Sequence, residues 1–224
     1  MNADSDRPTA RVATRPWARL LLLAVILLLS IWAWMPLPWR QPLVALLAVL
    51  WVVGVQREGR GMGWVRVADW RATMAWALGT AVLSCAVLTP LLEPLVDRLT
   101  GTTADYGSYG ALEGNVPAAL RLLTYAWISA AIGEEIIFRG LLLGQLLALF
   151  GSRPPAAAAA ILLGAVLFGL AHASQGLPGA LLTGAAGLLL GAVFVLSRRN
   201  LPAVILAHGL IDTWAVAALY LGRV

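Results

Sequence analysis

Residues 154–197 read PPAAAAAILLGAVLFGLAHASQGLPGALLTGAAGLLLGAVFVLS and contain no Asp, Glu, Lys or Arg. Because about 20 apolar residues in a helix cross a bilayer, this stretch is long enough for two spans. Gly176 and Pro178 are residues typical of turns, and they predict a break at 175–178 between the two spans. The stretch therefore indicates a membrane protein built from helical hairpins.

Other apolar stretches surround this pair. Uncharged runs cover 20–39, 41–56 and 72–92, and a last run at 200–222 is interrupted only by Asp212. The segment 116–150 also reads as helix, although it contains four charged residues. The sequence therefore predicts an all-α, polytopic transmembrane helix bundle of about seven spans, or eight if 116–150 breaks near Gly133 or Gly140.

The overall composition supports a membrane protein. Of the 224 residues, 60% are apolar and only 12% are charged, and the mean hydropathy is +0.83. These values exclude a disordered chain, and a single cysteine, Cys85, excludes a disulfide scaffold. In a soluble chain the net charge of +5 would suggest nucleic-acid binding; here we assign it to topology and expect no nucleic-acid partner.

The arginines predict how the chain lies across the membrane, because cytoplasmic loops collect basic residues. Four arginines precede the first apolar run, so we expect a cytoplasmic N-terminus. The loop 93–113 holds four acidic residues and one Arg and is expected outside. Arg153 and the pair Arg198 and Arg199 fall inside if 116–150 crosses once. We expect an integral protein of a bacterial inner (plasma) membrane.

Six ionisable residues interrupt the apolar stretches of the second half. A charge near the bilayer centre costs about 2.5–3.5 kcal/mol on insertion scales, and such residues are usually functional. The two histidines among them are the only histidines in the chain. The six residues are Glu134, Glu135, Arg139, His172, His208 and Asp212.

Helical spacing divides these residues into pairs. Residues four apart share a face, so Glu135 can pair with Arg139, and Asp212 can orient His208. Glu134 lies about 100° further round the axis and remains free for chemistry. We therefore interpret Glu135 and Arg139 as a structural ion pair.

The heights of these residues can be compared by counting from the turns. Glu134 and His172 each lie 19 residues from Arg153, so a hairpin turning there sets them level. His208 lies only 8 residues past Asn200, which places it roughly 16 Å nearer the cytoplasmic face. A tilted helix, a break at Gly140, or a hairpin carrying Glu134 into the cytoplasm would close this gap.

Two related mechanisms fit these groups. Zinc could be bound by His172 and His208 together with Glu134 or Asp212, leaving an open position for a water. Alternatively, Glu134 and His172 activate water directly, and His208 stabilises the oxyanion. The sequence contains neither a Gly-x-Ser-x-Gly elbow nor a His-Glu-x-x-His motif. Both mechanisms lead to peptide-bond hydrolysis.

Three short motifs carry a family resemblance. They read EEIIFR at 134–139, FGLAH at 168–172 and HGLID at 208–212. They resemble the successive EExxxR, FxxxH and Hxxx(N/D) motifs of the CAAX-protease and bacteriocin-processing family, also called CPBP or Abi. The motifs occur in order, each on its own apolar stretch, whereas residues before about 116 match only in being hydrophobic.

The resemblance implies an intramembrane endopeptidase whose eukaryotic relatives remove the last three residues of prenylated CAAX proteins. It implies a catalytic core at 116–224, preceded by a basic tail at 1–19 and by N-terminal helices and loops at 20–115. The expected partners are membrane lipid and a membrane-associated or lipidated protein substrate. The implied catalytic residues are Glu134, His172, His208 and Asp212, supported by Glu135, Arg139 and Phe168.

One residue departs from the family pattern. Asp212 stands where prenyl-processing members typically carry Asn, and an ionised Asp cannot donate to an oxyanion. It can orient His208 as a zinc ligand, so this residue favours the metal-dependent alternative. Hydrolysis by Glu134 without a metal is the other alternative.

Two rival classes remain. A catalytically silent family member would serve as a membrane scaffold or a bacteriocin-immunity protein, but such a member should have lost a motif residue. A proton- or ion-coupled transporter also places Asp, Glu and His within its spans. A transporter more often shows inverted repeats and paired broken helices, and the sequence shows neither.

Overall fold

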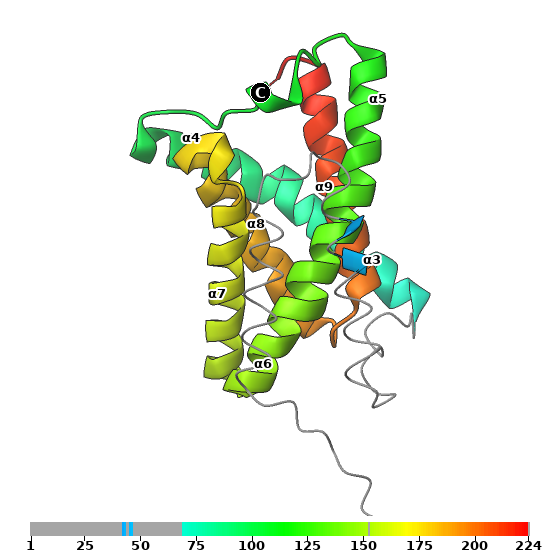
Figure 1. The fold of residues 1–224 in the computed structure, drawn as a ribbon, viewed down its shortest axis with the longest axis vertical. Helices are drawn as coiled ribbons and strands as arrows, with labels where there is room; N and C mark the ends of the chain where they lie inside the picture. The colour runs from blue at the N-terminus through cyan, green and yellow to red at the C-terminus, as the bar shows by residue number, and fades with distance from the viewer. Residues whose placement is uncertain (1–41, 44, 47–68, 152, 224) are drawn as a thin grey trace, which may run out of the picture.

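The computed structural model describes residues 42–43, 45–46, 69–151 and 153–223, and these are helical apart from short connections. The predicted spans at 20–39 and 41–56 and the basic tail lie outside the described residues, apart from a few positions near 45. The total of seven spans therefore stays a prediction. Figure 1 shows the helices in chain order.

The first long helical stretch runs from Trp70 to Thr100. It consists of α3 (Trp70–Val82), the π-helical η2 (Leu83–Leu88) and α4 (Thr89–Thr100). The side chain of Asp69 accepts hydrogen bonds from the first amides, and Gly101 in the left-handed conformation ends the stretch. The sequence placed the end of this helix at 92. The acidic residues at 93 and 97, expected in a loop, therefore lie on a helix.

The second stretch is helical from Val116 to Phe150. It comprises α5 (Val116–Tyr125), η4 (Ala126–Glu134), η5 (Ile136–Leu143) and α6 (Gly144–Phe150), of which η4 and η5 are π-helical. The helix continues through Gly133 and Gly140. The break on which the eight-span alternative depended is therefore not present in this segment. The π-helical turns coincide with the first motif, and such turns often occur at functional sites.

The predicted hairpin of 154–197 is confirmed, although its break lies at 172–175 and not at 175–178, because Gly176 and Pro178 belong to the first turn of the second helix. It contains α7 (Pro154–Ala171), the short 3-10 turn η6 (Ala173–Gln175) and α8 (Gly176–Leu196). A tight turn then leads to α9 (Leu201–Tyr220), whose first turn is capped by Asn200. Within the described residues, four helical stretches are long and apolar enough to cross a membrane: Trp70–Thr100, Pro154–Ala171, Ala173–Leu196 and Leu201–Tyr220.

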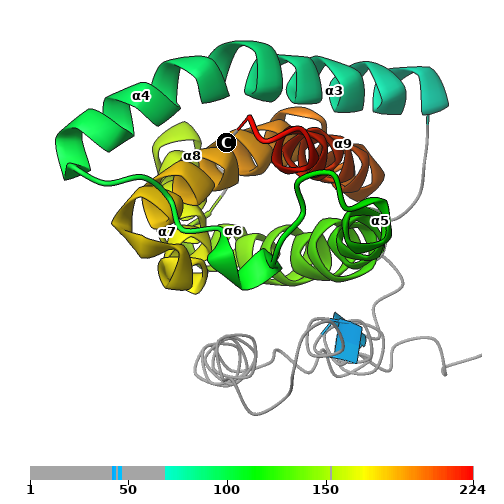
Figure 2. The same ribbon diagram turned by 90° about the horizontal axis from the view of Figure 1, so that it is seen from above.

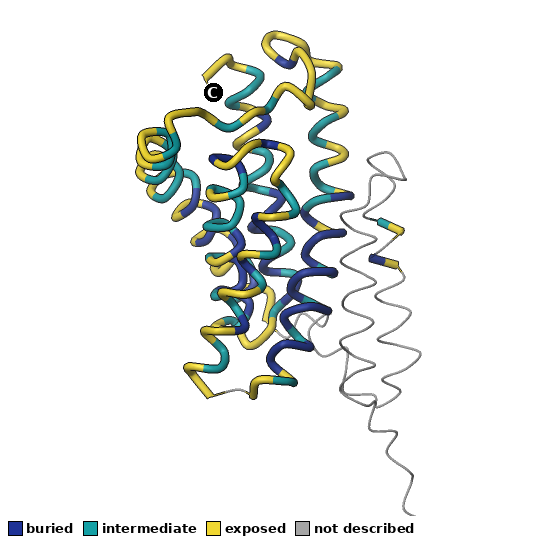
Figure 3. Tube along the Cα trace, turned by 60° about the vertical axis from the view of Figure 1, so that its left-hand side comes forward, coloured by how far each residue is buried: buried dark blue, intermediate teal, exposed yellow. Residues whose placement is uncertain are grey.

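The helices pack in layers that bring the three motifs together. Figure 2 shows α8 and α9 lying between the long helix α3–α4 on one side and the helix 116–150 on the other, with α7 beside α6. Figure 3 shows buried residues concentrated where the helices face one another, with both ends exposed. The largest fully buried apolar side chains are Ile137, Leu141, Phe168, Leu190, Phe194, Leu201 and Val204.

Candidate functional site

The EEIIFR motif is held in place by its arginine. Arg139 Nη1 donates to Glu135 Oε1 at 2.6 Å, and both side chains are almost completely buried. Arg139 Nη2 donates to the carbonyl oxygen of Gly187 on α8 at 3.1 Å. The guanidinium also lies 4.5 Å from the centre of the Phe168 ring. The predicted pairing of Glu135 with Arg139 is thus present, and it connects three helices.

His208 lies between two carboxylates. Its Nδ1 is 2.7 Å from Glu135 Oε1, and its Nε2 is 3.6 Å from Asp212 Oδ2. The pairing with Asp212 was expected from the four-residue spacing. The contact with Glu135 was not, because Glu135 was interpreted only as the partner of Arg139. Since a carboxylate only accepts, the Nδ1 proton of His208 is donated to Glu135.

Glu134 and His172 face each other at the same height, as their equal distances from Arg153 in the sequence predict. Glu134 Oε2 lies 4.0 Å from His172 Nε2. His172 Nδ1 is 2.9 Å from the carbonyl oxygen of Phe168, and because a carbonyl accepts, Nδ1 carries the proton. The unprotonated Nε2 is then directed at Glu134. A separation of 4.0 Å leaves both groups free to bind one water.

Glu134 differs from Glu135 in its partners and in its access. Within the part of the chain that the structure describes, the buried Oε2 of each glutamate has no hydrogen-bond partner, but Oε1 of Glu135 accepts from Arg139 and from His208. The side chain of Glu135 is fully buried, whereas that of Glu134 is 11% exposed. Its neighbour His172 is 22% exposed. Glu134 therefore lies on the less buried side of the cluster.

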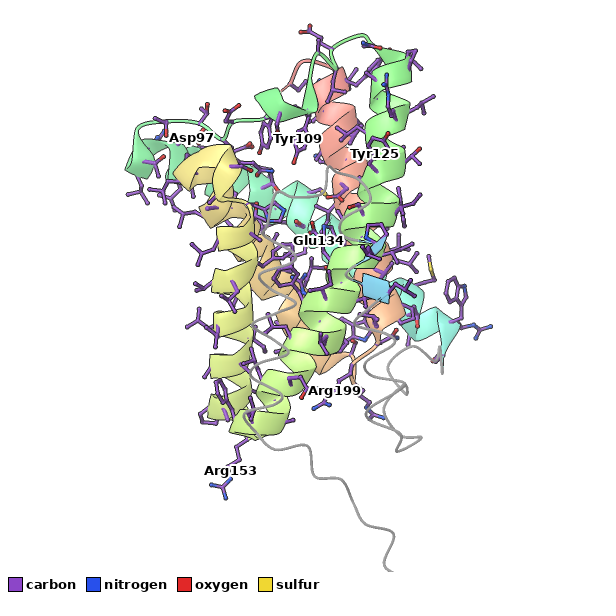
Figure 4. The ribbon with its side chains drawn as sticks, in the orientation of Figure 1. Asp97, Tyr109, Tyr125, Glu134, Arg153 and Arg199 are labelled. Carbon is purple, nitrogen blue, oxygen red and sulfur yellow. The ribbon has the colours of Figure 1, made fainter. Side chains whose placement is uncertain are left out.

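His208 reaches the height of Glu134 because the α8–α9 turn and the α6–α7 turn lie at different heights. In Figure 4, Arg199 at the α8–α9 turn lies closer to the level of Glu134 than Arg153 does. Figure 1 shows α8 running obliquely from the end of α7 down to the α8–α9 turn. A residue eight positions into α9 therefore reaches the first motif. The tilted helix was one of the three ways in which the sequence left this gap to be closed.

Tyr109 is a residue near the site that the sequence analysis missed. It belongs to η3 (Gly107–Tyr109), in the connection between α4 and α5. Its hydroxyl accepts a hydrogen bond from Gln175 Nε2 at 2.7 Å, and the backbone amide of Asp105 donates to the Gln175 carbonyl at 3.0 Å. In Figure 4 Tyr109 lies above Glu134, on the side opposite Arg153.

The charges that act on the Tyr109 hydroxyl agree with its position near Glu134 and Asp212. Desolvation, followed by the negative charges of Asp212 and Glu134, raises the pKa of its hydroxyl to about 12, against the hydrogen bond from Gln175, which lowers it. Tyr109 therefore stays neutral and keeps a proton that it can donate. No spacing or motif pointed to it, because it lies in a polar connection far from the three motifs in sequence.

The expected zinc ligands do not assemble into one group. Both ring nitrogens of His208 face carboxylates, and His172 Nδ1 is bound to a backbone carbonyl. Among the described residues, no three His, Cys, Asp or Glu side chains are arranged to hold a metal ion. The side chains as they stand do not fit zinc.

Comparison with known proteins agrees with the motifs. Residues 116–214 match the family model described as type II CAAX prenyl endopeptidase, Rce1-like. No curated protein and no solved structure matches the chain. The matched segment begins at the first residue of α5 and includes all three motifs, while Tyr109 lies outside it.

Proposed function

Because residues 116–214 belong to the Rce1-like family of type II CAAX prenyl endopeptidases, we propose that this chain is an intramembrane endopeptidase in which Glu134 activates water. The substrate class is a membrane-associated or lipidated protein. One observation carries the proposal: Oε2 of Glu134, to which no described residue donates a hydrogen bond, faces His172 Nε2 across 4.0 Å.

The first step is attack by water on the scissile carbonyl. A water between Glu134 and His172 donates one proton to Glu134 and is oriented by the lone pair on His172 Nε2. Its oxygen attacks the carbonyl carbon, and the negative charge moves to the carbonyl oxygen. The hydrogen bond from His172 Nδ1 to the Phe168 carbonyl fixes the ring for this role.

His208 stabilises the negative charge that develops on the carbonyl oxygen in this step. Its Nδ1 proton is bound to Glu135, which fixes the ring, and a proton on Nε2 is donated to the oxyanion. Asp212, 3.6 Å away, stabilises the positive charge of the doubly protonated ring. The intermediate then collapses: the carbon–nitrogen bond breaks, and Glu134 returns its proton to the leaving amine.

Substitution of Glu134 tests this assignment. We expect Glu134→Gln to abolish cleavage while the purified protein inserts and unfolds like the parent, because an amide cannot accept the proton from water. Glu113→Gln, an exposed carboxylate outside the cluster, is the matched control and should keep full activity.

The probes are a farnesylated CAAX peptide and an unprenylated single-span peptide in detergent micelles, with products identified by mass spectrometry. Cleavage by purified Glu134→Gln at the parental rate would refute the role of this carboxylate. Cleavage by neither variant nor parent, with both probes, would favour the scaffold or immunity alternative.

A further inference from the structure

We infer that Gln175 is a positioning residue for the hydrolysis: its bond to Tyr109 holds the turn that carries His172 and so keeps the His172 ring facing Glu134. The effect of Gln175 on rate rests on the proposed function, whereas its effect on the position of the ring does not. Neither Gln175 nor Tyr109 belongs to any of the three motifs.

The backbone of His172 lies just beyond the last residue of α7. Its φ of −105° and ψ of 16° are not helical values. The His172 amide still donates to the Gly169 carbonyl at 2.9 Å, but its own carbonyl accepts from the amide of Gln175 at 2.9 Å. The helix therefore holds His172 on one side, and the turn η6 holds it on the other.

The distance between His172 and Glu134 depends on this backbone. The bond of His172 Nδ1 to the Phe168 carbonyl fixes how the ring is rotated. It does not by itself fix the 4.0 Å between Nε2 and Glu134 Oε2, which changes whenever the turn moves. Because a misplacement of about 1 Å can cost about 100-fold in rate, whatever holds the turn also affects catalysis.

Gln175 is the residue through which the turn is held. It is only 9% exposed, whereas its neighbour Ser174 is exposed. Its Nε2 donates to the Tyr109 hydroxyl at 2.7 Å, and its carbonyl accepts from the amide of Asp105 at 3.0 Å. Among the described residues, both hydrogen bonds that join the connection 101–115 to this turn therefore use Gln175.

Gly179 leaves the space that the Gln175 side chain fills. A Cβ on Gly179 would collide with Gln175 Cβ and come within 3.0 Å of Gln175 Oε1. Gly179 is buried on α8, directly after the turn. The base of the glutamine side chain thus packs on the backbone of α8, and its end is bound by Tyr109. With both ends fixed, the side chain cannot shift unless the turn shifts with it.

Tyr109 has contacts that do not depend on Gln175. Its ring stacks on that of Tyr106, with the centroids 6.2 Å apart, and its amide donates to the Tyr106 carbonyl at 3.0 Å. Figure 4 shows Tyr109 above Glu134. A residue of the connection 101–115 is therefore linked through Gln175 to His172.

Gln175→Met and Tyr109→Phe test this link in the full-length protein in detergent micelles. Methionine still fills the space beside Gly179 but cannot donate, and phenylalanine keeps the ring but cannot accept. We expect each variant to lower kcat about 10- to 100-fold with KM unchanged. The double variant should be no slower than either single variant, because all three lose the same bond. Ser174→Ala and Tyr106→Phe are the matched controls and should keep the parental kcat.

A spectroscopic measurement separates positioning from a general loss of stability. His172 and His208 are the only histidines in the chain, so the ring-nitrogen NMR signals of isotope-labelled histidine report on these two rings alone. A His172→Asn variant assigns them. We expect Gln175→Met and Tyr109→Phe to shift or broaden the His172 signals and to leave those of His208 as in the parent.

Three outcomes would overturn the positioning role of Gln175. They are a parental kcat in both variants, unchanged His172 signals in both, and equal changes in the signals of His172 and His208, which would indicate a loosened fold. If the parent cleaves neither the farnesylated nor the unprenylated peptide, the proposed function fails. The NMR signals then decide by themselves whether Gln175 holds the His172 ring.

Discussion

His208 Nδ1 lies 2.7 Å from Glu135 Oε1, the same oxygen that accepts from Arg139 at 2.6 Å. One oxygen of the first motif therefore holds both an arginine of its own helix and the histidine of the third motif. Glu135 links the ion pair to the site, and its removal should disturb both.

Loss of Arg139 is expected to destabilise the protein. Arg139→Ala leaves the buried carboxylate of Glu135 without its arginine partner, and removing one partner of a buried ion pair costs about 3–5 kcal/mol. We expect a lower thermal midpoint in detergent as well as lower activity. Arg121→Ala, an exposed arginine on α5, is the control. An Arg139→Ala protein that is inactive yet as stable as the parent would show that Arg139 serves the chemistry itself.

Metal removal decides between the two mechanisms that the sequence left open. Because both ring nitrogens of His208 face carboxylates and His172 Nδ1 is bound to a backbone carbonyl, we expect activity to survive a chelator and Asp212→Asn to cleave at or above the parental rate. An amide at 212 can donate to the oxyanion, which a carboxylate cannot. If chelation abolishes activity, zinc restores it and Asp212→Asn weakens metal affinity about 10- to 100-fold, the zinc expectation is right.

The hydroxyl of Tyr109 should fix the connection above the site. Tyr109→Phe removes the acceptor of the Gln175 hydrogen bond, and we expect faster hydrogen exchange at the amides of 105–110. Tyr106→Phe is the matched control, because it keeps the ring that stacks on Tyr109 and leaves the Gln175 bond in place. Equal exchange in both variants would mean that the hydroxyl does not anchor this connection.

The same hydroxyl predicts a pH dependence. Its pKa rises from 10.0 to about 12 on folding, so between these values the unfolded chain binds fewer protons than the folded one. The free energy of unfolding therefore falls as the pH rises through this window, and below it the stabilisation is fully present. We expect Tyr109→Phe to unfold with a shallower pH slope there than the parent. An unchanged slope would contradict the prediction.

Gly169 is predicted to be required for the close approach of α7 and α8. A Cβ at this position would collide with the carbonyl oxygen of Ala180 and approach the backbone of Gly184. We expect Gly169→Ala to lower stability by about 1–3 kcal/mol, the usual cost of overpacking. A Cβ on Gly164, in the same helix, meets nothing within 4 Å, so Gly164→Ala should leave the thermal midpoint nearly unchanged. Equal midpoints for the two variants would refute the packing argument.

Local and hairpin relationships could be predicted from the sequence. The four-residue spacing gave the pairs of Glu135 with Arg139 and of His208 with Asp212, and equal distances from Arg153 set Glu134 level with His172. The end of α4 was predicted wrongly. Glu93 was taken as the start of a loop because it is charged, although the helix continues to Thr100.

Relationships between distant helices could not be predicted. The height of His208 depends on the tilt of α8, which no residue spacing encodes, so its bond to Glu135 was missed. Tyr109 was missed because a tyrosine in a polar connection carries no periodic signal, and its place beside Gln175 follows only from how the ends of the helices meet.

The pairing of Glu135 with Arg139 also bears on how the protein enters the bilayer. Both residues belong to the same helix, so their charges can neutralise each other as soon as that helix forms. Gly187 and His208, which complete their contacts, lie on helices synthesised later. During biogenesis the helix 116–150 thus meets lipid with only one unneutralised carboxylate, Glu134, and the later helices dock onto an ion pair that is already made.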